Sequence, residues 1–269
     1  MRDLERLKQK KLFLLDMDGT LYLDEHLFDG AAEFLFYIRE SGGRYLFLTN
    51  NSSKSGDAYV EKMRRLGIEA TREDFLTSVD ATILYLREHG GQDKLYYAFG
   101  TESFKAQLRE AGFRLTDDRD AMVDTLLMGF DTELTFRKLE DACILLGRGV
   151  EYIATNPDWV CPTWYGYVPD CGSVCEMLRK ATGRGPYVIG KPKPDMVNLA
   201  IKKVNLLPEE AVVVGDRLYT DIACGVNAGV DTVLVLSGET TRREAETGDV
   251  KPDFILQDIK ALLEVIKSK

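Results

Sequence analysis

The segment that decides the fold runs from Leu12 to Phe28 and reads LFLLDMDGTLYLDEHLF. It opens with an apolar run that predicts a short buried strand, and the run stops abruptly at Asp16. A second acid follows at Asp18, and Gly19 then permits a tight turn whose N–H groups can face an anion. Side chains two residues apart in an extended chain point the same way, so the two carboxylates can share one pocket. A polar turn after a core strand would give the same letters, and the segment alone leaves both interpretations open.

The two ends of the chain predict the same alternation of strands and helices. Strands that alternate with helices imply a parallel sheet covered on both faces, so the predicted fold class is α/β with a Rossmann-like core. The predicted strands are 11–15, 44–50, 187–190, 211–215, 231–236 and 253–256, and the predicted helices are 30–42, 55–68, 194–205, 220–228 and 258–267.

A second α/β pattern lies between these two ends. Its predicted strands are 94–100, 124–130 and 150–156, and its predicted helices are 101–111, 135–147 and 172–182. The sequence therefore predicts a discontinuous core made of 1–81 and 186–269. Residues 82–185 are predicted to form a smaller inserted α/β domain.

The composition limits the classes of function. The 269 residues carry a net charge of −9, which argues against general nucleic-acid binding because that activity needs a basic face. No apolar stretch reaches the ~20 residues that span a bilayer. The first residues, MRDLERLKQKK, lack the apolar core of a signal peptide, so we expect a cytoplasmic protein that does not enter a membrane. The five cysteines are odd in number and irregularly spaced, which favours reduced thiols over disulfides.

Polar residues also follow three other predicted strands. Thr49 and Asn50 end the second strand, Lys191 follows the strand at 187–190, and Asp216 ends the strand at 211–215. Asp221 opens the next helix. Taken one at a time, these residues are more often helix caps or a surface lysine than parts of a site.

Together these residues predict one site at the carboxyl ends of the strands, where open parallel sheets bind ligands. Crowded carboxylates repel one another unless a cation lies among them. The segments offer oxygen ligands and no histidine, and hard oxygen ligands fit Mg²⁺.

Four ordered motifs, DMDGT, LTNN, GKPKPD and GDRLYTDI, resemble those of the haloacid dehalogenase-like (HAD) phosphohydrolases. The resemblance covers essentially the whole chain, and the insertion lies where that family carries its large α/β caps. Two stretches of the insertion, GFDTELTFRKLEDA and IATNPD, resemble the NagD-type subgroup, also called 4-nitrophenylphosphatase-like. The implied function is a Mg²⁺-dependent phosphatase that hydrolyses small phosphomonoesters, including 4-nitrophenyl phosphate, through an aspartyl-phosphate.

The resemblance also implies a role for each residue at the strand ends. Asp16 would be the nucleophile, and Asp18 would act first as general acid and then as general base. Side-chain oxygens of Asp16 and Asp216, with the backbone carbonyl of Asp18, would ligate Mg²⁺. Thr49, Asn50 and Lys191 would hold the phosphoryl group, and Asp221 would orient Lys191 or a water on the metal.

One loop of the insertion departs from the subgroup. Where those proteins commonly show Pro-Gly-Ala-Gly-Ser, this chain has Pro-Asp-Cys-Gly-Ser at 169–173. The surrounding segment, 156–173, is expected to be irregular, polar and aromatic, and therefore to act as a lid that selects the ester. Trp164 and Asp170 are its candidate specificity residues.

Several alternatives remain open at this stage. A phosphomutase or phosphotransferase could use the same aspartyl-phosphate, although similar mutases carry their cap between the first and second motifs. A dehalogenase would not need the acid at position 18, and a non-catalytic module would have no need of every motif acid. The substrate could be a nucleotide, sugar or cofactor phosphate. A homodimer is also possible, since similar proteins often pair through their caps.

Overall fold

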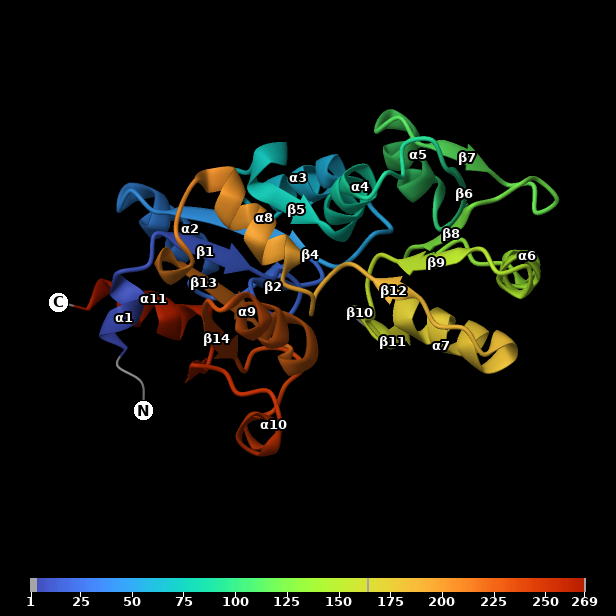
Figure 1. Ribbon diagram of the computed structural model, residues 1–269. Coiled ribbons are helices and arrows are strands. Elements are labelled where there is room, and N and C mark those ends of the chain that lie inside the picture. Colours follow the sequence, from blue (N-terminus) through green and yellow to red (C-terminus); the bar gives the residue numbers. More distant parts are fainter. Residues whose placement is uncertain (1–3, 164, 269) are drawn as a thin grey trace. The chain divides into compact units, whose positions relative to one another are not determined.

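The computed structural model describes residues 4–163 and 165–268, which form two compact units (Figure 1). Of these described residues, unit 1 comprises those within 1–49, 59–76 and 191–269, and unit 2 comprises those within 50–58 and 77–190. In Figure 1 unit 1 joins the blue beginning of the chain to its orange and red end, while most of unit 2 is green and yellow. The domain limits of 82 and 185 stay a prediction of the sequence.

Unit 1 is built on a six-stranded sheet with the order β15-β14-β13-β1-β4-β5. Its central strand, β1, pairs in parallel with β4 on one side and with β13 on the other, so that Leu14 faces both Leu46 and Val213. All four residues of β1 are buried, as expected for a strand covered on both faces. The strands are β1 Leu12–Leu15, β4 Arg44–Thr49, β5 Phe75–Thr77, β13 Ala211–Gly215, β14 Asp231–Val235 and β15 Phe254–Leu256, and a small hairpin pairs β2 Tyr22–Leu23 with β3 His26–Leu27.

Helices cover this sheet. Phe13 and Leu15 of β1 share one apolar core with Phe34 of α2 and with Ile259 and Leu262 of α11. The unit's α-helices are α1 Glu5–Lys8, α2 Ala31–Glu40, α3 Gly56–Arg65 (whose first three residues are counted in unit 2), α8 Asp195–Val204, α9 Ala223–Ala228, α10 Arg242–Thr247 and α11 Ile259–Lys267. Shorter turns are η1 Arg72–Asp74, η2 Pro208–Glu210 and the π-helical η3 Leu218–Ile222.

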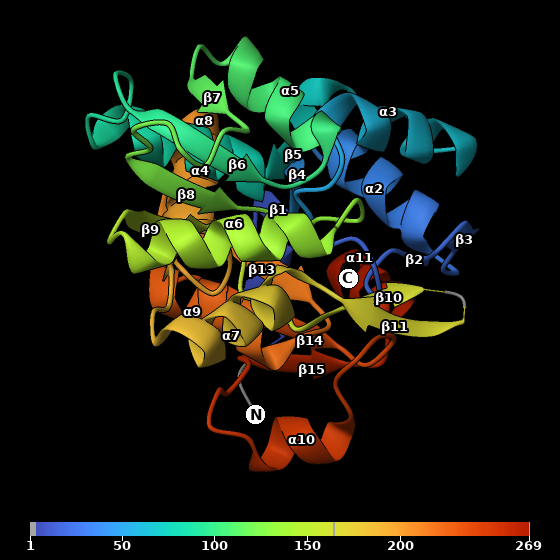
Figure 2. The ribbon, with the colours of Figure 1, turned by 90° about the vertical axis from the view of Figure 1, so that its right-hand side faces the viewer.

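Unit 2 contains a five-stranded sheet with the order β12-β9-β8-β6-β7, and every neighbouring pair is parallel. Helices α6 and α7 lie beside this sheet (Figure 2). Their apolar residues share one core with Phe99, Met128 and Tyr152 of its strands. The strands are β6 Leu95–Phe99, β7 Arg114–Thr116, β8 Thr125–Met128, β9 Glu151–Ala154, β10 Val160–Thr163, β11 Gly166–Pro169 and β12 Tyr187–Val188, and the helices are α4 Ser78–Glu88, α5 Glu102–Glu110, α6 Phe136–Gly147 and α7 Cys171–Thr182.

Two sequence predictions are wrong. The strand predicted at 187–190 was expected to extend the core sheet, but β12 has only two residues and pairs with β9 in unit 2. A short apolar run identifies a strand without identifying its partner. The segment 156–173 was expected to be irregular, but it contains an antiparallel hairpin, β10–β11. Two prolines obscured its alternation, and both lie in the outer strands of a two-stranded ribbon, where a proline is tolerated.

The aromatic residues of β6 and the cysteines contribute to the interior of the protein. Tyr96 and Phe99 are fully buried in unit 2. All five cysteines are free thiols, and the sulfur atoms of Cys171 and Cys175 lie 3.9 Å apart on one face of α7. None of the helices in the described part of the chain is long and apolar enough to cross a bilayer.

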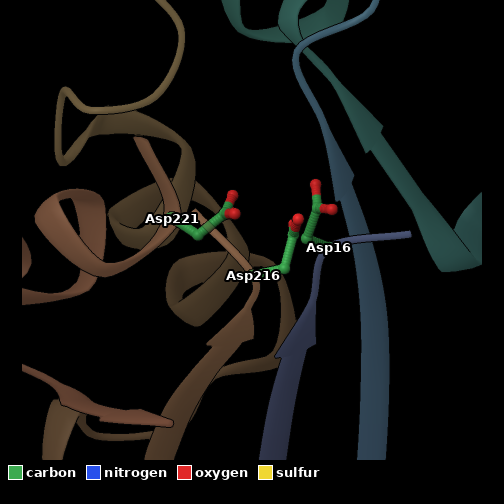
Figure 3. Close-up of side chains that lie close together, drawn as sticks. All are labelled: Asp16, Asp216 and Asp221. Carbon is green, nitrogen blue, oxygen red and sulfur yellow. The ribbon is translucent and has the colours of Figure 1, made fainter. Parts of the chain in front are cut away.

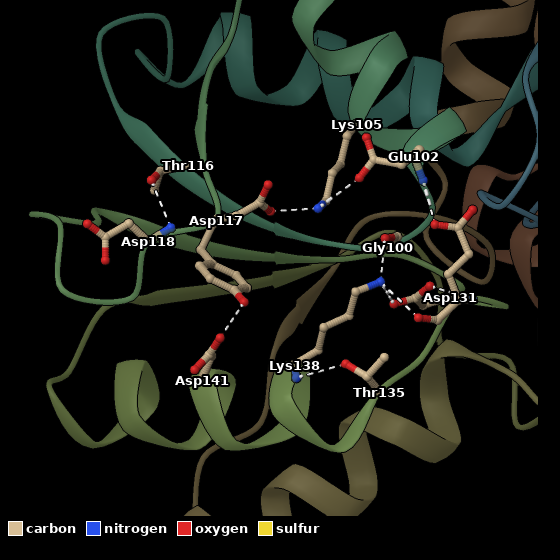
Figure 4. Close-up of polar contacts among 12 residues, drawn as sticks. Gly100, Glu102, Lys105, Thr116, Asp117, Asp118, Asp131, Thr135, Lys138 and Asp141 are labelled. Carbon is tan, nitrogen blue, oxygen red and sulfur yellow. Dashed lines mark hydrogen bonds and ion pairs between the residues drawn. The ribbon is translucent and has the colours of Figure 1, made fainter.

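A lysine secures one loop of unit 2 (Figure 4). The ammonium group of Lys138 on α6 lies 2.8 Å from Asp131 and also donates to the carbonyl oxygens of Gly100 and Glu133. The Asp131 side chain is 1% exposed, so its charge depends on this partner. Breaking a buried ion pair on one side leaves an uncompensated charge.

We expect Lys138→Met to destabilise the protein by about 2–3 kcal/mol, because it leaves the buried Asp131 carboxylate unpaired. The midpoint of urea unfolding, followed by circular dichroism, measures the effect. Lys94→Met is the matched control, because Lys94 pairs with Glu151 at the surface, where a salt bridge contributes under about 1 kcal/mol. Equal midpoints for the two variants would contradict the role given to Lys138.

Candidate active site

Three carboxylates converge at the carboxyl end of the unit 1 sheet (Figure 3). Asp16 directly follows β1 and Asp216 directly follows the neighbouring strand β13, so the parallel pairing of the strands brings them together. Asp221 comes from η3, the turn that leads into α9. One oxygen of each lies within 4.8 Å of the others. The sequence prediction that these three acids meet is confirmed.

Lys191 lies among the acids. Its ammonium nitrogen is 2.6 Å from an oxygen of Asp16 and 2.6 Å from an oxygen of Asp221, and it donates to the Leu48 carbonyl at 3.1 Å. The lysine and Asp221 side chains are almost fully buried, whereas the Asp16 side chain keeps 16% of its surface exposed. Asp221 is fixed from its other side by the backbone N–H of Arg217. The lysine is therefore held in place before any substrate arrives.

Glycines allow this close packing. Gly19 has a φ of +86°, and a Cβ there would lie 2.5 Å from Oδ2 of Asp216. A Cβ at Gly238 would overlap the same carboxylate, and one at Gly215 would overlap Asp221. The backbone thus approaches two of the acids at positions where only glycine fits.

Burial and mutual repulsion raise the pKa values of two acids. Burial raises the pKa of Asp216 to about 7, with a further contribution from the charge of Asp221. Burial, followed by the charge of Asp221, raises the pKa of Asp16 well above its usual range, although Lys191 opposes the shift. Burial alone would lower the pKa of Lys191, but the charges of Asp16 and Asp221 outweigh it and raise that pKa. One lysine does not neutralise three acids.

The residues fit a divalent cation. Oδ1 of Asp216 is buried and makes no hydrogen bond in the described part of the chain, while Oδ2 accepts from the N–H of Glu239 at 2.7 Å. A buried carboxylate oxygen that accepts no hydrogen bond is costly unless a cation or another donor satisfies it. The donor set consists of oxygen atoms, which suits a hard cation such as Mg²⁺.

Asp18 and Thr49 lie in unit 1 but outside the carboxylate cluster. The Asp18 side chain is 35% exposed, and its oxygens lie 3.6 Å from the ammonium of Lys62 and 3.5 Å from the hydroxyl of Tyr22. Thr49 is the last residue of β4 and is buried. The roles predicted for both stay predictions.

The other predicted residues belong to unit 2 or lie outside the described residues. Asn50 is buried, and its carbonyl accepts from the Ser78 hydroxyl at 2.7 Å. Asp170 is the buried N-cap of α7, and its Oδ1 accepts from the amide of Asn156 at 3.0 Å. Trp164 is not among the residues that the structure describes. Selection of the ester by Trp164 and Asp170 stays a prediction of the sequence.

Sequence reasoning missed two features that adjoin the site. The loop after β14 closes over Asp216: Glu239 donates to its side chain, and Thr240 donates to its carbonyl at 3.2 Å. This loop follows a predicted strand end, so the rule that located the acids could have included it. Lys62 was also missed, because one lysine among the charges of a surface helix carries no signal in the sequence.

Comparisons with known proteins agree with this geometry. A family model described as haloacid dehalogenase-like hydrolase matches residues 13–114, and a second, described as HAD-hydrolase-like, matches residues 188–262. The acid sugar phosphatase of Staphylococcus haemolyticus is 33% identical over 261 residues, which are 97% of this chain and 98% of that protein. The chain belongs to the haloacid dehalogenase-like hydrolases.

Solved structures of HAD-like phosphatases resemble the whole chain. The 4-nitrophenylphosphatase of Thermotoga maritima is 39% identical with a TM-score of 0.91, over 97% of this chain and 99% of that one. The glycerol phosphate phosphatase of Mycobacterium tuberculosis, solved in complex with magnesium, is 30% identical with a TM-score of 0.89, over 96% of this chain and 77% of that one. This HAD-like chain is thus a phosphatase of the NagD-type, 4-nitrophenylphosphatase-like subgroup.

We expect Gly19→Ala to lower phosphate release from phosphomonoesters by about tenfold or more, because the new methyl group displaces Asp216. Gly42→Ala is the matched control: Gly42 has a φ of +78°, but a Cβ there meets no atom within 4 Å. Both variants should lose about 1–2 kcal/mol of stability from the left-handed backbone. Similar activity losses in both would show that the close approach to Asp216 is unimportant.

Proposed function

We propose that this phosphatase hydrolyses small phosphomonoesters through an aspartyl-phosphate formed on Asp16, with Mg²⁺ bound beside it. One observation carries the choice of nucleophile. Among the three clustered acids, Asp16 has a partly exposed side chain, whereas the side chain of Asp221 and the whole of Asp216 are almost fully buried. A nucleophile must reach its substrate, and the two buried acids are better suited to holding charges in place.

The names of the relatives support the substrate class. They include an acid sugar phosphatase, a 4-nitrophenylphosphatase and a glycerol phosphate phosphatase. We propose that sugar and polyol phosphates are the natural substrates, with 4-nitrophenyl phosphate accepted as a model ester.

The proposed reaction has two steps. A carboxylate oxygen of Asp16 attacks phosphorus, and the bond from phosphorus to the leaving oxygen breaks as Asp18 supplies a proton to that oxygen. A water then attacks the aspartyl-phosphate, Asp18 takes its proton, and inorganic phosphate leaves. Lys191 and Thr49 stabilise the phosphoryl oxygens, and Asp221 keeps Lys191 directed at Asp16.

The cation would be held by side-chain oxygens of Asp16 and Asp216 and by the backbone carbonyl of Asp18. When bound, Mg²⁺ supplies positive charge to the phosphoryl oxygens and to the crowded acids. The buried Oδ1 of Asp216 supports this assignment, because it accepts no hydrogen bond in the described part of the chain.

We expect Asp16→Asn to fold normally and to lose about three or more orders of magnitude in kcat, because an amide cannot form the phosphoenzyme. Acid quenching with a radiolabelled phosphomonoester should trap label on the wild type and none on the variant. Asp258→Asn is the control, since Asp258 caps α11 and asparagine caps equally well. Retention of roughly a tenth of wild-type kcat by Asp16→Asn would rule out the covalent route.

We expect EDTA to abolish activity and Mg²⁺ to restore it, with Mg²⁺ affinity falling as the pH falls through about 7. The pKa of Asp216 is raised to about 7, so below that pH the metal must displace a proton, whereas above it the carboxylate is already ionised. Calorimetric titration with Mg²⁺ at about pH 8 and about pH 6 measures the difference. Full activity in excess EDTA, or equal affinities, would exclude this site.

A further inference from the structure

Lys62 differs from the other charged residues at the end of α3. Arg64 pairs with Glu61 and Arg65 pairs with Glu25, and all four of these side chains are more than half exposed. The Lys62 side chain is only 13% exposed and turns toward the loop that follows β1. Unlike its charged neighbours, Lys62 is therefore largely buried, and its surroundings need a separate explanation.

The ammonium of Lys62 lies between an aromatic ring and a carboxylate. It is 3.9 Å from the centre of the Tyr22 ring and 3.6 Å from Oδ1 of Asp18. The Tyr22 hydroxyl lies 3.5 Å from the other oxygen, Oδ2. Each oxygen of the Asp18 carboxyl group thus lies near a different side chain, Lys62 or Tyr22. These two side chains also form a cation–π pair with each other.

The two contacts are too long to bind the Asp18 carboxyl group tightly, but they limit the orientations that it can adopt. Contacts of 3.5–3.6 Å are at the limit of a hydrogen bond, and an ion pair to a partly exposed carboxylate is weak. Tyr22, however, is fully buried, so its ring is a fixed platform for the ammonium. Attraction between Oδ1 and the ammonium on this ring limits rotation about the Cβ–Cγ bond of Asp18.

We propose that Lys62, seated on Tyr22, is a positioning residue that keeps the Asp18 carboxyl aligned for proton transfer to the leaving oxygen. This inference rests on the proposed function of Asp18. Asp18 is 35% exposed, and no tight hydrogen bond is seen to hold its carboxyl oxygens in the described part of the chain. The ammonium of Lys62 beside Oδ1 therefore orients a carboxyl group that the backbone turn at Gly19 does not itself orient.

The proposal predicts a dependence on the leaving group. An alkoxide is a poor leaving group unless it is protonated, whereas 4-nitrophenolate leaves readily without a proton. The ratio kcat/KM reports the steps up to departure of the leaving group, so it isolates the acid role of Asp18 from its later role as base. A purely structural Lys62 would affect both kinds of ester alike.

The test compares kcat/KM for glycerol 3-phosphate and for 4-nitrophenyl phosphate. We expect Lys62→Met, which keeps the stem over Tyr22, to lose about tenfold on the alkyl ester and less than about twofold on the aryl ester. Lys62→Arg should recover most of the loss, because a guanidinium also stacks on an aromatic face. The matched control is Lys267→Met, which removes a lysine 5.4 Å from the ring of Tyr37 and should change neither ratio.

A double-mutant cycle with Asp18→Asn separates the possible failures. If Lys62 acts through Asp18, Lys62→Met should cause no further loss in the Asp18→Asn background. Additive losses, or equal losses on both esters, would overturn the role of Lys62 while leaving the proposed function intact. If Asp18→Asn itself shows no preference for the better leaving group, the acid role of Asp18 fails, and the inference fails with it.

Discussion

The site depends on Lys191, which forms one ion pair with Asp16 and another with Asp221, each at 2.6 Å. Lys191 thereby offsets part of the negative charge of the three acids, of which Asp16 is partly exposed and the other two are buried. Burial raises the pKa values of Asp16 and Asp216, and the excess negative charge of three carboxylates against one ammonium raises them further. This excess is a poor arrangement for stability and a good one for a site that receives a cation and a phosphate ester together.

The fold makes this crowding possible because parallel strands end at the same edge. β1 and β13 are hydrogen-bonded neighbours, so the residues that follow them are adjacent in space. Strands that are apolar over their whole length anchor this edge in the core. The polar edge is therefore built directly onto the packed core, an arrangement that suits preorganised electrostatic stabilisation.

The sequence was sufficient to predict the fold class and the meeting of Asp16, Asp216, Asp221 and Lys191, but not the place of every strand. Asp16 and Asp216 could be placed together because each ends an apolar run, and the direction of parallel strands does the rest. β12 could not be assigned to a sheet, since two residues carry no information about their partner. The pairing of β10 with β11 could not be predicted, because the prolines in both strands obscured the alternation. Lys62 could not be distinguished from its neighbours, because burial of a helix residue depends on the loop packed against it.

The chain order of the sheet has a consequence for synthesis. Asp16 and Lys191 are 175 positions apart, and β1 lies between strands from the beginning and the end of the chain. Unit 2 is nearly continuous in sequence and is complete before β13 has been translated. A growing chain on the ribosome therefore carries Asp16, the proposed nucleophile, long before it carries Lys191 and the acids that cluster with it. The protein becomes an enzyme only in the last third of its translation, and removal of that third by proteolysis would eliminate the site in a single cut.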